Sequence, residues 1–149
     1  MKIEEELKQD KFTSAVHKAI VNIMFTDGWL SCQLRDVFKD HNITPQQYNV
    51  LRILRGKFPH SLNPSDIKSV MLDKNPDLTR LCDRLLTRKL IDRCIDDGNR
   101  RKMNIRITEE GLKMLNLIDP IMSEFNKKIA TLSEEEASIL SNLLDKMRG

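Results

Sequence analysis

Apolar residues recur every three or four positions over residues 10–38, a spacing that predicts one long amphipathic helix with a weak point at Gly28. The same period returns in an apolar stripe between Leu112 and Ile129, which predicts a second long helix, bent at Pro120. A capping box at Ser133–Glu136 marks the start of the last helix. Both ends of the chain are therefore predicted to be helical.

Three shorter helices are predicted in the middle of the chain, each begun by a polar cap and a proline. The starts are Thr44-Pro45, Asn63-Pro64 and Asn75-Pro76-Asp77, and the first of these helices ends at Gly56. The third helix, beginning near residue 78, places leucines on one face and charged residues on the other.

After Leu90 the period changes from helical to alternating. Residues 91–95 and 103–107 alternate between apolar and polar side chains, and Asp97-Gly98 between them is a turn signal. This pattern predicts a β-hairpin whose tip, residues 96–102, contains three consecutive cations. The fold class is therefore mainly α with a small β-hairpin.

The net charge of +3 hides an asymmetry along the 149-residue chain. Residues 50–106 carry a net charge of +7, whereas residues 1–49 carry −1 and residues 107–149 carry −3. A basic middle segment in a helical frame favours a polyanionic partner, although a solvated basic face without a partner is the simpler alternative. No apolar stretch is long enough to span a membrane, and the three cysteines form no CxxC pair, so a cytoplasmic protein is expected.

Four short segments in this order resemble the multiple antibiotic resistance regulator (MarR) family of bacterial transcription factors. They are Leu78–Leu85, Leu90-Ile91, Asp97–Arg101 and Ile107–Leu112. The resemblance implies a winged helix-turn-helix DNA-binding domain at residues 44–108, set in a helical dimerisation region formed by residues 1–43 and 109–149. It also implies a homodimer that binds a roughly palindromic operator in double-stranded DNA. Repression is expected in preference to activation.

Within this resemblance, the base-reading positions of the family fall on Pro76, Asp77, Thr79 and Arg80. Arg80 is the best candidate for direct contact with a base, since arginine can donate two hydrogen bonds to guanine. Its alternative role is an ion pair with Asp77 or with Asp83, one turn further along the helix. For Arg84, DNA contact and pairing with a carboxylate are equally open interpretations.

The wing residues of the family correspond to Arg100 and Arg101, with Lys102 beside them, and an arginine there can enter a narrow minor groove. Two positions depart from the family pattern. Asn99 stands where an acidic residue usually precedes the arginine pair. Lys89 stands where a glycine usually ends the recognition helix, so a left-handed backbone there would be strained.

Family members often release DNA when a small aromatic or phenolic effector binds beside the dimerisation helices. Trp29, His41 and Tyr48 are candidates to line such a cleft, although core or interface packing is the simpler interpretation of the two aromatic rings. Cys32 is a candidate thiol sensor, whereas Cys82 lies on an apolar stripe and is expected to be inert.

No enzymatic activity, cofactor or metal site is predicted, because the three histidines are isolated and no nucleophile or phosphate-binding motif is present. The main alternative to a DNA-binding regulator is a winged-helix module that docks an acidic protein without binding a specific DNA sequence.

Overall fold

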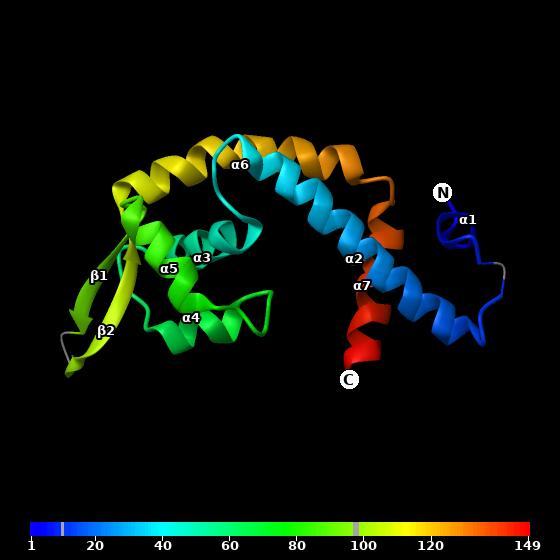
Figure 1. Cartoon of the computed structure of the whole chain (residues 1–149), viewed down its shortest axis with the longest axis horizontal. Coiled ribbons are helices and arrows are strands. Elements are labelled where there is room, and N and C mark those ends of the chain that lie inside the picture. Colours follow the sequence, from blue (N-terminus) through cyan, green and yellow to red (C-terminus); the bar gives the residue numbers. More distant parts are fainter. Residues whose placement is uncertain (10, 97–98) are drawn as a thin grey trace.

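The computed structural model describes residues 1–9, 11–96 and 99–149 and confirms a mainly helical fold with one two-stranded antiparallel hairpin (Figure 1). The elements are α1 (Ile3–Leu7), α2 (Ala15–Lys39), α3 (Pro45–Arg55), α4 (Pro64–Val70), α5 (Leu78–Thr87), β1 (Ile91–Asp96), β2 (Asn99–Ile107), α6 (Glu109–Ile129) and α7 (Glu134–Arg148).

The helix starts follow the predicted caps with two differences. Thr44, Asn63, Thr108 and Ser133 each accept a hydrogen bond from the third backbone amide of the helix that follows. Asp77, the last residue of the predicted Asn75-Pro76-Asp77 start, caps α5. The first long helix begins later than predicted, at Ala15, and a short helix α1 precedes it that the apolar period did not indicate.

Both long helices are continuous. α2 runs unbroken past Gly28, the predicted weak point, and α6 contains Pro120, the site of the predicted bend, in its interior. No helix in the described part of the chain has the length and apolarity that crossing a membrane would require.

The strands of the hairpin are longer than predicted. The register pairs Ile91 with Ile107 and Ile95 with Met103, but the next residue, Asp96, pairs with Asn99. Residues 100–102 of β2 therefore form a bulge without partners on β1 in this register. Most of the predicted tip is therefore strand backbone. Leu62, just before α4, adds a bridge to β2: its N–H donates to the carbonyl oxygen of Ile105, and the Ile105 N–H donates back, both at 2.8 Å.

The hydrophobic core lies between α3, α4, α5, the hairpin, the C-terminal end of α2 and the first half of α6. Figure 1 shows α3, α4, α5 and the hairpin at one end of the molecule, α1 and α7 at the other, and α2 and α6 running between them. The fully buried side chains of the core include Phe38, Leu51, Leu54, Ile67, Leu85, Ile91, Leu115 and Ile118. None of the residues of α7 is buried.

Gly111 allows α6 to begin directly against the end of α5. A Cβ atom at this position would lie 2.2 Å from the carbonyl oxygen of Leu90 and 2.6 Å from Cγ1 of Ile107. Thr108 fixes the same junction, because its hydroxyl donates to the carbonyl oxygen of Lys89 at 2.7 Å and accepts from the Gly111 N–H at 3.1 Å. Thr108 and Gly111 together thus allow α6 to pack against the end of α5.

Lys89 ends α5 with a left-handed backbone, with φ of 59°. The N–H of Lys89 donates to the carbonyl oxygen of Leu86 at 2.8 Å, and the N–H of Leu90 donates to that of Leu85 at 3.0 Å. This pair of bonds is the Schellman arrangement, which glycine adopts without steric cost. A side chain in this conformation costs about 1–2 kcal/mol, so the strain expected from the sequence is present in the fold.

We expect Lys89→Gly to raise the free energy of unfolding by about 1 kcal/mol, since relief of the left-handed strain exceeds the extra chain entropy of glycine. Urea unfolding at one fixed chain concentration measures the change. Lys89→Ala is the matched control, because it removes the same charge but keeps a Cβ. Equal stability of the two variants would show that the backbone strain at this position is negligible.

Candidate nucleic-acid interface

The recognition helix α5 separates apolar from polar side chains cleanly. Its buried face packs into the core and consists of Leu78, Leu81, Cys82 and Leu85. Its outer face exposes Thr79, Arg80, Asp83, Arg84 and Thr87. A helix of this diameter, about 10–12 Å with side chains, fits the major groove of B-form DNA. The exposed face is therefore the candidate base-reading surface.

Both carboxylates that could have paired with Arg80 have other partners. Asp77 uses its Oδ1 atom to accept the backbone N–H of Arg80 at 3.1 Å, and Asp83 Oδ1 accepts from Nη2 of Arg93 at 2.6 Å. Within the described ranges, the guanidinium groups of Arg80 and Arg84 form no ion pair. Two unneutralised cations one helical turn apart thus lie on the outer face of α5.

The other two positions at the start of α5 have different environments. Pro76 is buried, so it presents little surface to a partner in this structure. Asp77 is exposed but serves as the helix cap, and its carboxylate would repel a nearby phosphate. Thr79 is exposed beside Arg80 and carries a hydroxyl that can both donate and accept.

Two arginines that hold α5 in place were not among the residues predicted from the sequence. Arg88, at the end of the helix, donates from its guanidinium to the backbone carbonyl oxygens of His41 and Asn42 in the loop between α2 and α3, the former at 3.2 Å. Arg93 ties β1 to the middle of α5 through Asp83. The alternation of the first strand, which puts Arg93 on the same face as the buried Ile91, was the available signal for this contact.

A bidentate ion pair joins the winged part of the chain to α6. Arg55 of α3 donates to both carboxylate oxygens of Asp119, at 2.6 and 3.2 Å. The hydrogen bonds to this carboxylate raise the pKa of the Arg55 guanidinium further above its already high value, so the guanidinium stays charged throughout the physiological range. The contact fixes α3 relative to the long helix that leaves the domain.

The wing residues Arg100, Arg101 and Lys102 belong to the backbone of β2, and their side chains lie outside the described residues. Their roles stay predictions. The described part of the hairpin also contains Arg106, which is exposed. Its Nη2 atom forms an ion pair with Oδ2 of Asp92 on the paired strand, at 3.7 Å.

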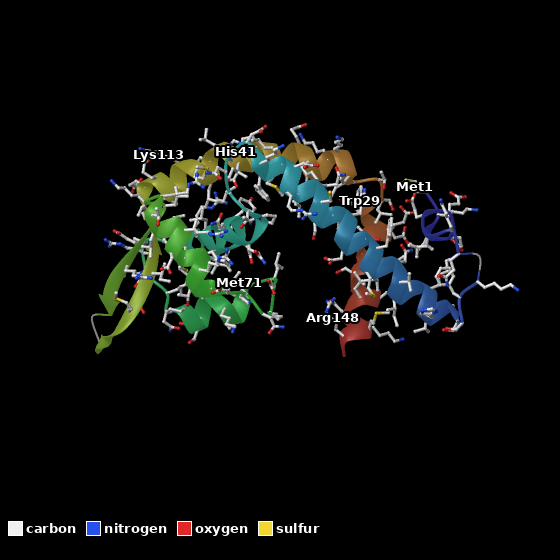
Figure 2. The ribbon with its side chains drawn as sticks, in the orientation of Figure 1. Met1, Trp29, His41, Met71, Lys113 and Arg148 are labelled. Atoms are coloured by element: carbon white, nitrogen blue, oxygen red, sulfur yellow. The ribbon has the colours of Figure 1, made fainter. Side chains whose placement is uncertain are left out.

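The three candidate effector residues do not share one cavity. Trp29, on α2 (Figure 2), lines a cavity of about 500 Å³ against α1 and residues 131–132. Tyr48 is buried in the core with its ring centroid 4.8 Å from that of Phe38. His41 lies near the far end of α2, in the loop that Arg88 contacts (Figure 2).

The cysteines occupy three different environments: Cys32 is exposed on α2, Cys82 is buried, and Cys94 is half-buried on β1. Burial raises the pKa of the Cys82 thiol to about 11, with a smaller contribution from the charge of Asp83. The thiol is therefore protonated near neutral pH and a poor nucleophile. Among the residues that the structure describes, no group of three histidine, cysteine or acidic side chains is arranged to hold a metal ion.

Comparison with known proteins identifies relatives over most of the chain, although no family model matches it. The HTH-type transcriptional regulator MhqR of Bacillus subtilis is 30% identical over 108 residues, which cover 72% of this chain and 73% of MhqR. The crystal structure of a MarR transcription factor from Planctomyces limnophilus superposes with a TM-score of 0.66 at 29% identity, over 91% of this chain and 98% of that one.

A DNA complex is among the similar structures. The S. aureus MepR–DNA complex matches with a TM-score of 0.77 at 25% identity, over 92% of this chain and 97% of that one. These relatives are transcription regulators and not enzymes, in agreement with the sequence analysis. Together with the capped recognition helix, its hairpin and the two long helices that frame them, they show that this chain belongs to the MarR family of winged helix-turn-helix transcription regulators.

Proposed function

We propose that this regulator binds a palindromic operator as a homodimer, represses transcription by occupying that operator, and is released by a small-molecule effector. The observation that carries the proposal is the exposed face of α5, where Arg80 and Arg84 have no carboxylate partner within the described ranges. An arginine left unpaired on a rigid helix is ready to donate to guanine or to phosphate without first breaking an ion pair.

The proposed division of labour follows the burial pattern. Residues 44–108 form the DNA-binding domain, and nearly all of the hydrophobic core lies in or against this segment. Residues 1–43 and 109–149 form the dimerisation region. Such a regulator acts where the chromosome is, which in bacteria is the cytoplasm.

Exposed apolar side chains on α2 and α7 support the proposed dimer. Val16 and Met24 of α2 are 64% and 70% exposed, and Leu143 and Met147 of α7 are 59% and 50% exposed. An apolar groove of about 490 Å³ runs between these two helices. Large apolar side chains left exposed on neighbouring helices typically mark a protein interface, and two-fold symmetry would pair these helices with their copies in a second chain.

The test is a selection of short DNA duplexes by the purified protein at near-physiological salt, followed by sequencing of the retained duplexes. We expect an inverted repeat with half-sites about one helical turn, roughly 10 bp, apart. The same selection with Leu143→Glu, which buries a charge in the proposed dimer interface, should lose the repeat. Asn142→Glu, a neighbouring position outside the α2–α7 groove, is the matched control.

The salt dependence of binding separates this proposal from the alternative of a protein-docking module. Six to ten phosphate contacts imply that affinity falls by roughly 10³- to 10⁵-fold between 50 and 200 mM salt. Retention of duplexes without any shared sequence would contradict the proposal and favour the docking module.

A further inference from the structure

A cavity of about 530 Å³ lies between the end of α2, the start of α3 and the outer side of α5. It is distinct from the cavity that Trp29 lines and contains neither Trp29, His41 nor Tyr48 among its lining residues. Its size is within the usual range for small-molecule sites, about 300–1,000 Å³.

The lining of this cavity is strongly cationic. Lys39 at the end of α2 and both Arg84 and Arg88 on the α5 side contribute side chains from two separate parts of the chain. None of the described residues that line the cavity is acidic, and neither Lys39 nor Arg84 forms an ion pair in the described part of the chain. Three cations around one hollow attract anions, and their mutual repulsion is relieved when an anion binds.

Gln47 adds a polar side chain to this lining. It lines the cavity and is only 4% exposed. Its Oε1 atom accepts the N–H of Thr44 at 3.0 Å, while its side-chain N–H groups have no hydrogen-bond acceptor among the described residues. This amide can therefore donate to an anion that enters the cavity.

The cavity also lies where the end of α5 is attached to the α2–α3 loop. Arg88 holds the end of the recognition helix to the backbone of the α2–α3 loop, and Arg84 belongs to the proposed DNA-binding face. A negatively charged occupant would compete with DNA phosphates for Arg84 and with the loop carbonyls for Arg88.

We propose that this cavity binds a small molecule carrying two or more negative charges, in the form of phosphate or carboxylate groups, and that its occupancy weakens DNA binding. The regulatory half of this inference rests on the proposed function and gives the effector a chemical class. The binding half is independent of it. Organic phosphates and polycarboxylates share the required chemistry, and two probes separate them.

The first experiment is calorimetric titration of the full-length protein, without DNA, with inorganic pyrophosphate and with citrate, at an ionic strength held constant with sodium chloride. We expect saturable binding of at least one probe with one site per chain, and the probe that binds identifies the phosphate or the carboxylate source. Absence of saturable binding of both probes overturns the proposal.

Lys39→Gln should weaken probe binding about tenfold, because it removes one of the three charges that face the anion. Lys128→Gln is the matched control: Lys128 is an exposed cation on α6 outside the cavity and forms no ion pair in the described chain. Equal weakening by the two substitutions would mean that the probes respond to overall charge, and it would overturn the site.

The second experiment measures DNA binding with and without the bound probe, again at constant ionic strength. The probe should weaken binding of the wild-type protein and of Lys128→Gln by at least fivefold, and that of Lys39→Gln much less. Saturable probe binding with unchanged DNA affinity overturns the regulatory half alone. If Lys39→Gln loses DNA affinity as strongly in the absence of a probe, the cavity is a phosphate contact for DNA and the effector site is wrong.

Discussion

Replacing Arg80 with alanine is expected to flatten the preference of this regulator among DNA sequences, with a loss of roughly 5- to 150-fold in discrimination at one base pair of each half-site. A bidentate arginine–guanine contact contributes about 1–3 kcal/mol of discrimination. Within the described ranges the Arg80 guanidinium forms no ion pair, so none is lost with the side chain. Competition binding between the selected operator and single-base variants measures the effect.

Arg101→Ala is the informative comparison for this prediction. A wing arginine that contacts the backbone or the minor groove should weaken all sites to a similar degree and lower the slope of affinity against salt. Thermal unfolding should be nearly unchanged in Arg80→Ala, since the residue is exposed. Intact sequence preference in Arg80→Ala would show that α5 does not read bases through this residue.

Gly111→Ala should lower the free energy of unfolding by about 3 kcal/mol, the upper range for overpacking a fixed backbone contact. The new methyl group would have to displace the carbonyl oxygen of Leu90, which lies 2.2 Å from the position of its Cβ. Because Leu90 lies three residues after the end of α5, we also expect weaker DNA binding. Urea unfolding at equal chain concentration measures the first effect.

Gly28→Ala is the control with the opposite expected sign. Apart from its chain neighbours and the backbone of its own helix, no described residue lies within 4 Å of a Cβ at Gly28, which is in the interior of α2. Alanine is a better helix former by about 1 kcal/mol, so this variant should be more stable than the wild type. Similar stabilities of the two variants would contradict the close packing at the α5–α6 junction.

The features that local chemistry determines could be predicted from the sequence. Polar caps followed by proline marked the starts of α3 and α4, and the leucine stripe of α5 left Arg80 and Arg84 on the outer face, because both signals act within a few residues. The change of period after Leu90 located the hairpin but missed its bulge, since a bulge is set by pairing between strands.

The contacts that hold the candidate site together could not be predicted in the same way. The bonds of Arg88 to the α2–α3 loop and of Arg55 to Asp119 join residues 46 or more positions apart in the sequence. No periodicity specifies such partners. The cavity beside Lys39 was missed for the same reason, because its cations come from helices that meet only in the folded chain.

The hydrogen bonds from Arg88 to the α2–α3 loop constrain the arginine more than they constrain the loop residues. Its acceptors are the main-chain oxygens of His41 and Asn42, which any amino acid at these positions would supply. Substitutions at position 41 therefore leave these hydrogen bonds intact. Substitutions at position 42 are restricted only by the backbone φ of 51°, which small polar residues tolerate. Arg88 has no such freedom, since lysine cannot span two carbonyls with a planar fork. Among proteins that share this architecture, we therefore expect the arginine at position 88 to be invariant while the residues at positions 41 and 42 vary.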